Sequence, residues 1–141
     1  VVMTRAGSAI LTDMLVGVIQ EGTGRRAAVL KRPLAGKTGT TDEYRDALFV
    51  GFSPSIACGV WVGSDHFHTL GDRESGARAA LPIWMAYMQE VLASQPVDYF
   101  DSPDDIVRIS IDPISGKPAA ADAQGAVVAM FKKGTEPQMA P

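Results

Sequence analysis

The sequence lacks several features that would mark it as a particular class of protein. It has a single cysteine, Cys58, which excludes an internal disulfide framework. No apolar run approaches the roughly 20 residues that span a bilayer, and no signal-peptide pattern is present. Lys and Arg number 13 against 16 Asp and Glu, a formal net charge of −3. This balance argues against nucleic acid or an anionic membrane as the main partner.

Length and composition limit what the chain can be. With 141 residues, of which 46% are hydrophobic, it is long enough to bury one core. It opens on Val1-Val2-Met3, and we expect it to be a piece of a longer protein whose export signal or anchor lies elsewhere. The two histidines, His66 and His68, form a His-x-His pair, but no acidic residue is fixed near them at helical spacing. We therefore do not expect a metal site at this pair.

Hydrophobic periodicity predicts two helices. Apolar residues from Ile10 to Ile19 repeat at helical spacing, which predicts a helix over about 4–21 with Thr4 as its N-cap. A second amphipathic helix is expected over about 77–94. Its predicted buried stripe is Leu81, Ile83, Trp84, Tyr87, Met88, Val91 and Leu92.

Three strand-like runs lie between these helices, over 34–41, 46–53 and 56–64. Their connections are short and polar, which favours an antiparallel meander. The aromatic residues Phe49, Phe52, Trp61 and Trp84 are expected to form the core between sheet and helix. The predicted fold class is therefore α+β, an antiparallel sheet with flanking helices.

The segments outside this sheet are also predicted. Residues 25–33 read as a basic connector, 96–105 as a linker, and 106–112 and 125–131 as strands of a small C-terminal segment.

The run Lys37-Thr38-Gly39-Thr40-Thr41 places a cation, three hydroxyls and a glycine on one predicted strand. Lysine supplies charge, the hydroxyls donate hydrogen bonds and glycine lets another backbone approach, which together suit a peptide carboxylate. Because a peptide pairs only with a free edge, we expect an edge strand here. Strict alternation puts Lys37 and Thr38 on opposite faces, so a site that uses both must lie off that edge.

A phosphate-binding P-loop is a competing interpretation of Gly36-Lys37-Thr38. That motif needs a glycine five residues before Gly36, where this chain has Lys31. It also needs a long helix after the lysine, whereas a second strand follows here. Nucleotide binding is therefore disfavoured.

Lys-Thr-Gly is one of three signatures of serine β-lactamases and penicillin-binding proteins. The other two, Ser-x-x-Lys and Ser-x-Asn, are absent, since no serine has a lysine three residues later and the chain contains no asparagine. The order of its motifs nevertheless closely resembles the C-terminal part of the transpeptidase domain of class A penicillin-binding proteins. These motifs are GTGRR at 22–26, AGKTGTT at 35–41, RDALFVGF at 45–52, GVWVGSD at 59–65 and GTEP at 134–137.

The resemblance implies a role for each residue of the central run. Lys37 would favour the substrate through its charge and help to move protons, and the Thr38 and Thr40 hydroxyls would hold a peptide or β-lactam carboxylate. The backbone N–H of Thr40 would be one of two oxyanion-hole donors. Gly39 would keep the strand edge clear, and Thr41 would extend the substrate-binding run. Lys37 and Thr40 are thus the expected catalytic residues, with the nucleophilic serine absent from this chain.

The resemblance also implies a domain division and partners. Residues 1–95 would be the C-terminal portion of a transpeptidase domain with an incomplete β-lactamase-like fold, 96–105 a linker and 106–141 a small β-rich tail. The parent would be a serine D,D-transpeptidase on the periplasmic or outer face of the bacterial inner membrane, whereas this piece alone would be inactive. Its partners would be peptidoglycan stem peptides, β-lactams and the remainder of its own chain, and it would need no metal or organic cofactor. Exposed apolar surface would also allow self-association. A non-catalytic peptide-binding module and a serine β-lactamase remain the alternatives.

Overall fold

The computed structural model describes residues 2–66 and 68–138, which form two compact units. The larger unit spans Met14–Phe100, and the smaller one combines the residues up to Asp13 with those from Asp101 onward. Helix α1 (Arg5–Gln20) contributes residues to both units. Residues 139–141, the end of the predicted tail, lie outside the described residues. No helix in the described part of the chain is both long and apolar enough to cross a membrane.

Helix α1 begins and ends where its flanking residues predict. Thr4 is the N-cap, because its Oγ1 accepts a hydrogen bond from the Gly7 N–H at 3.1 Å. After Gln20 the chain turns at Gly22 and Gly24, and the Gly24 N–H donates to the Val18 carbonyl at 3.0 Å. The predicted helix over 4–21 is confirmed, although of its apolar positions in the larger unit only Ile19 is fully buried.

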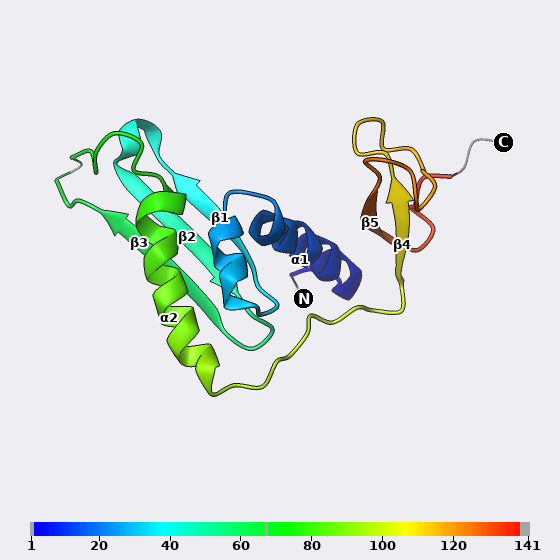
Figure 1. Cartoon of the computed structure of the whole chain (residues 1–141), viewed down its shortest axis with the longest axis horizontal. Coiled ribbons are helices and arrows are strands. Elements are labelled where there is room, and N and C mark those ends of the chain that lie inside the picture. The colour runs from blue at the N-terminus through cyan, green and yellow to red at the C-terminus, as the bar shows by residue number, and fades with distance from the viewer. Residues whose placement is uncertain (1, 67, 139–141) are drawn as a thin grey trace. The chain divides into compact units, whose positions relative to one another are not determined.

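The three predicted strands form an antiparallel meander in the larger unit (Figure 1). They are β1 (Ala35–Thr40), β2 (Asp46–Phe52) and β3 (Ala57–Gly63), in the spatial order β1-β2-β3. Within the described residues β1 pairs only with β2, so it is an edge strand as predicted. The register pairs Lys37 with Val50 and Thr38 with Phe49. Short η2 (Asp42–Tyr44) connects β1 to β2.

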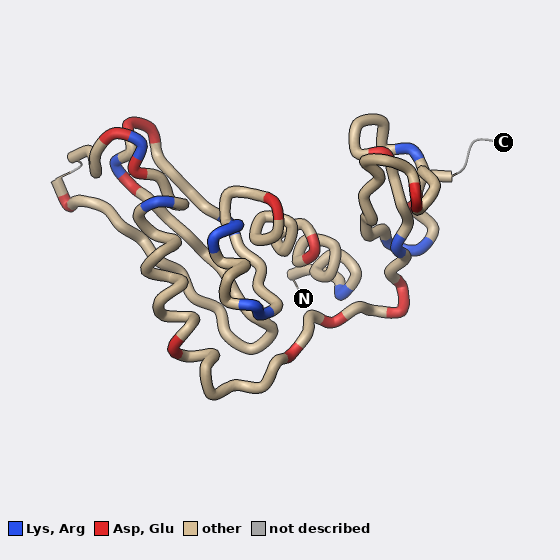
Figure 2. Tube along the Cα trace, viewed as in Figure 1, with Lys and Arg blue, Asp and Glu red and all other residues tan. Residues whose placement is uncertain are grey.

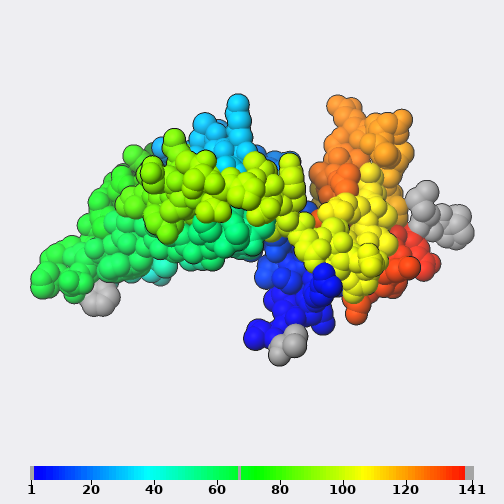
Figure 3. Space-filling view, turned by 90° about the horizontal axis from the view of Figure 1, so that it is seen from below, coloured from blue at the N-terminus to red at the C-terminus, as the bar shows by residue number. Residues whose placement is uncertain are grey.

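Helix α2 (Leu81–Ala93) covers one face of this sheet, and the space-filling view shows it packed directly on the strands (Figure 3). It follows a π-helical turn, η3 (Gly76–Ala80), and Pro82 lies in its first turn. Trp84 packs edge-to-face on Phe49, with ring centroids 4.9 Å apart, and both side chains are fully buried. The buried helix residues are Leu81, Trp84, Met88 and Leu92. We call this face of the sheet, which carries Phe49, the helix face.

Three of the predicted core residues are exposed. Ile83 and Tyr87 remain 53% and 49% exposed. The helix turns Trp84 and Met88 toward the sheet, and each exposed residue directly precedes one of these, so it points about 100° away around the helix axis. Trp61 is 55% exposed, since it pairs with Leu48 on the face opposite α2. Its indole lies against Gly63, where a Cβ would come within 2.3 Å of the ring.

Residues 25–33 also differ from the predicted connector. They form a 3₁₀ helix, η1 (Arg25–Leu30), whose Ala27 joins the core beneath α2. The helix ends at Lys31, which has a left-handed φ of 50°. Arg25 and Arg26 are exposed.

The smaller unit contains an antiparallel hairpin of β4 (Ile106–Ile111) and β5 (Val127–Lys132), close to the two predicted strands. A turn follows β4, in which the Asp112 carboxylate accepts the N–H groups of Ile114 at 2.7 Å and Ser115 at 2.9 Å. The extended chain between α2 and β4 carries only acidic charges (Figure 2), from Asp98, Asp101, Asp104 and Asp105.

Candidate functional site

The Lys37 side chain passes around the free edge of β1. Its Nζ donates to the Thr38 carbonyl at 3.0 Å and lies 3.5 Å from Thr38 Oγ1. The register puts Lys37 on the exposed face and Thr38 on the helix face. Because no described strand pairs with the outer side of β1, the ammonium can reach around the strand. A cation and a hydroxyl therefore meet off the edge, although their Cβ atoms start on opposite faces.

The main chain of β1 also presents polar groups at this edge. One step beyond the last strand pair, the Thr41 N–H donates to the Asp46 carbonyl of β2 at 3.0 Å. Main-chain groups of successive strand residues point alternately toward and away from the paired strand. The N–H and C=O groups of Thr38 and Thr40 therefore point away from β2. The contact of Lys37 Nζ with the Thr38 carbonyl agrees with this direction.

Gly39 and Thr40 are held by the start of η3. The Gly76 N–H donates to Thr40 Oγ1 at 3.1 Å, which leaves the hydroxyl hydrogen of Thr40 free to donate elsewhere. Gly76 is buried so close to the sheet that a Cβ there would lie 2.1 Å from the Leu48 carbonyl oxygen and 2.5 Å from that of Gly39. Only glycine fits this contact. The close packing of Gly76 on the carbonyl of Gly39 therefore sets the distance between β1 and η3.

Thr41 makes its side-chain hydrogen bonds within the β1–β2 turn. Its Oγ1 accepts the Asp46 N–H at 2.8 Å and donates to Asp46 Oδ2 at 3.2 Å. The second oxygen of this carboxylate accepts the indole N–H of Trp61 at 3.0 Å. The turn contains two residues with left-handed φ, Glu43 and Tyr44, so these bonds close a strained segment. Among the five predicted site residues, Thr41 is the one whose hydroxyl is bound to this turn.

Three residues that contact the predicted run were not predicted from the sequence to belong to the site: Gly76, described above, Thr23 and Asp46. Thr23 Oγ1 lies 2.9 Å from Thr38 Oγ1, and Asp46 joins Thr41 to Trp61. Thr23 stands in the GTGRR motif, so its position between two glycines was the available signal. Asp46 offered none, because its partners are five and fifteen residues away.

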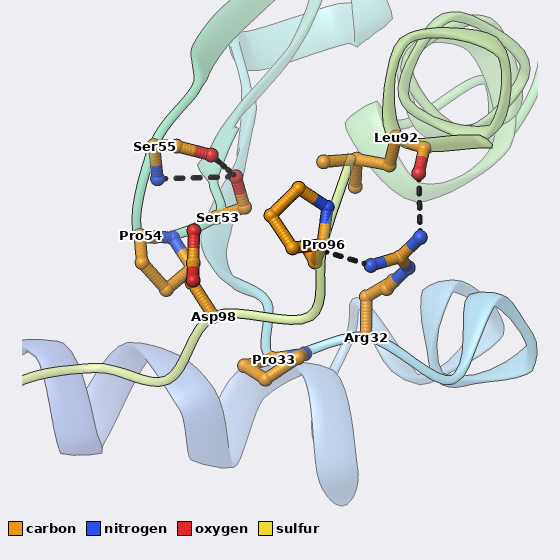
Figure 4. A pocket seen from close by; sticks show the side chains of 8 residues that line it. All are labelled: Arg32, Pro33, Ser53, Pro54, Ser55, Leu92, Pro96 and Asp98. Carbon is orange, nitrogen blue, oxygen red and sulfur yellow. Dashed lines mark hydrogen bonds between the residues drawn. The ribbon is translucent and has the colours of Figure 1, made fainter. Parts of the chain in front are cut away.

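A small cavity lies elsewhere in the larger unit, beside Arg32 (Figure 4). Its volume is about 10 Å³, room for no more than a single water molecule. The Arg32 guanidinium donates to the carbonyl oxygens of Leu92, Gln95 and Pro96, and so caps the C-terminus of α2. These contacts make Arg32 a structural residue that ties the segment before β1 to the end of α2.

Two groups of the smaller unit, Asp112 and Arg5, have shifted pKa values. Hydrogen bonds from the Ser115 and Ile114 backbone N–H groups lower the pKa of the Asp112 carboxyl. A side-chain hydrogen bond with Asp101, aided by its negative charge, raises the pKa of Arg5. Among the described residues, no three His, Cys, Asp or Glu side chains gather as metal ligands would.

Comparison with known proteins gives relatives that share one name. The chain is 46% identical over 138 residues to penicillin-binding protein 1A of Aquifex aeolicus, covering 98% of this chain and 19% of that protein. It is 47% identical over 129 residues to penicillin-binding protein 1A of Pseudomonas aeruginosa, covering 91% and 16%. The crystal structure of penicillin-binding protein 1A from Haemophilus influenzae superposes with a TM-score of 0.88 at 30% identity, over 98% of this chain and 22% of that one.

No protein-family model matches the chain. The part matched in the curated relatives is C-terminal, and the chain spans about a fifth of their length. The Haemophilus influenzae structure and this chain share an α+β architecture.

Proposed function

This chain belongs to the penicillin-binding protein 1A family, and we propose that it supplies one wall of the active site of a peptidoglycan D,D-transpeptidase. The reaction would be acyl transfer, in which a serine outside this chain attacks a D-Ala-D-Ala peptide and an amine of a neighbouring stem peptide resolves the acyl-enzyme. This chemistry belongs on the outer side of the cytoplasmic membrane, where the cell wall is built.

One observation carries the proposal: the Lys37 ammonium and the Thr38 hydroxyl meet off the free edge of β1. A carboxylate placed there would receive a charge-assisted hydrogen bond from each of them. The Thr40 hydroxyl points to the same face as Thr38, two residues along the strand, and has its hydrogen available for the same carboxylate.

The main chain of the edge supports the remaining roles. The Thr40 N–H, which points away from β2, would donate to the oxyanion that forms when the serine attacks. Substrate backbone would pair with the outward groups of Thr38 and Thr40, as an added strand. Gly39 would serve this pairing indirectly, because its close contact with Gly76 fixes the position of the strand.

The partners that follow are peptidoglycan stem peptides and β-lactams, together with the rest of the parent chain. Val50 and Trp61, each 55% exposed, lie on the face opposite α2 and would be covered by that remainder or by a second copy. Residues 96–105 would separate the transpeptidase portion from the tail, as the sequence predicts.

Intact-mass measurement after incubation with a reactive penicillin tests the proposal. We expect a stable adduct on the protein extended upstream in its own gene and none on the 141 residues alone. An adduct on the 141 residues would contradict the external serine. Extended protein that gains no adduct, yet binds D-Ala-D-Ala peptides reversibly, would instead be a non-catalytic binding module. An adduct that hydrolyses within seconds would indicate a β-lactamase.

A further inference from the structure

Thr23 contacts the same hydroxyl that the proposed function assigns to carboxylate binding. Its Oγ1 lies 2.9 Å from Thr38 Oγ1, although the two residues are 15 positions apart. Lys37 Nζ approaches the same Thr38 oxygen at 3.5 Å. Thr38 therefore has a polar neighbour on each side, the ammonium from beyond the edge and the hydroxyl from the turn after α1.

The turn that carries Thr23 is packed tightly against the end of α1. A Cβ on Gly22 would lie 2.9 Å from Val18 Cα, and one on Gly24 would lie 2.9 Å from Ile19 Cδ1. The Gly24 N–H also donates to the Val18 carbonyl at 3.0 Å. The close packing of Gly22 and Gly24 on α1 thus fixes the position of Thr23 between them. The contact of Thr23 with Thr38 therefore follows from how the turn packs on the helix.

The chemistry of the three groups sets the direction of the hydrogen bonds. An ammonium only donates and an ionised carboxylate only accepts. When a carboxylate binds, the Thr38 hydroxyl must donate its hydrogen to it, so Thr38 Oγ1 must accept from Thr23.

We infer that Thr23 is a positioning residue, which donates to Thr38 Oγ1 and thereby directs the Thr38 hydroxyl hydrogen toward the carboxylate of the acyl donor. The inference rests on the proposed function, and it names a further residue that would help the site to select its acyl donors. Discrimination for donors with a free carboxylate would come partly from a residue that does not touch them.

The test compares acylation rates in the full-length protein for a penicillin and for its methyl ester, in which the carboxylate is masked. Thr23→Val removes the donor while keeping the shape, and Thr23→Ser keeps the donor. We expect Thr23→Val to slow acylation by the free penicillin about 3- to 10-fold, the value of one hydrogen bond. Its rate with the ester should stay within about twofold of the unaltered protein, and Thr23→Ser should resemble the unaltered protein with both compounds.

Each other outcome overturns the inference in a distinguishable way. Equal slowing with both compounds would mean that Thr23 only supports the fold, and unchanged rates would mean that Thr38 needs no orienting partner. Absence of any acylation in the unaltered protein would overturn the proposed function itself. Thr135→Val is the matched control, because that hydroxyl donates only to the Lys132 carbonyl in the smaller unit.

Discussion

Replacing Gly76 with alanine should destabilise the larger unit more than any other single-methyl addition to a glycine there. The added Cβ would lie 2.1 Å from the Leu48 carbonyl oxygen, 2.5 Å from that of Gly39 and 3.1 Å from the Gly39 nitrogen. All three atoms belong to the backbone, so no side chain can move aside. The strand pair or η3 must shift by roughly 1 Å to restore ordinary contact.

The cost follows from two losses. Overpacking that moves backbone costs about 1–3 kcal/mol, and the shift would stretch the Gly76 N–H bond to Thr40, worth about 1 kcal/mol. The total of about 2–4 kcal/mol should lower the Tm of a domain of this size by at least about 8 °C.

Gly17→Ala is the matched control, since a Cβ there would meet nothing within 4 Å. Gly17 lies inside α1, where alanine should stabilise by about 0.5–1 kcal/mol. Thermal unfolding followed by circular dichroism gives both changes in the isolated chain. Hydrogen exchange of β1 and β2 peptides gives the same comparison in the full-length protein. A Gly76→Ala variant with a Tm within about 2 °C of the unaltered protein would refute the reasoning.

Three further changes test other contacts. Lys37→Ala in the full-length protein should slow penicillin acylation about 10- to 100-fold with an unchanged circular dichroism spectrum, and an unaltered rate would remove Lys37 from the site. Asp46→Ala should cost about 1–2 kcal/mol in urea unfolding, and prior replacement of Trp61 by Phe should reduce that cost, because the two share a hydrogen bond. Arg32→Lys should lower the free energy of unfolding by a similar amount, because an ammonium cannot reach three carbonyls at once. A urea midpoint equal to that of the unaltered protein would contradict the capping role of Arg32.

The elements of the larger unit could be predicted because their signals are local. Short polar connections at 42–45 and 53–55 define the meander, and Thr4 and Gly22 mark the limits of α1. The face of α2 was harder to assign. Apolar residues lie around much of that helix, so periodicity could not separate Trp84, which is buried, from Ile83, which is exposed.

The sequence predicted the residues of the candidate site that lie within the Lys-Thr-Gly run and none of those that contact it from elsewhere. The Lys-Thr-Gly run identified the strand from its own residues, and the expected pairing with a peptide identified that strand as an edge. The partners of that run come from elsewhere in the chain: Thr23 from the turn after α1, and Gly76 from the start of η3. Such contacts depend on how separate elements pack, which no local pattern in a single sequence encodes.

Under the proposed function, the outward main-chain groups of β1 would limit antibiotic resistance that arises by mutation. A point mutation can remove the hydroxyl of Thr38 or Thr40, but every residue except proline retains its backbone N–H. An inhibitor that gains most of its affinity by pairing with this backbone would therefore be difficult to evade by changing side chains. Mutational escape would have to displace the strand itself, and the contact between Gly39 and Gly76 makes that displacement costly.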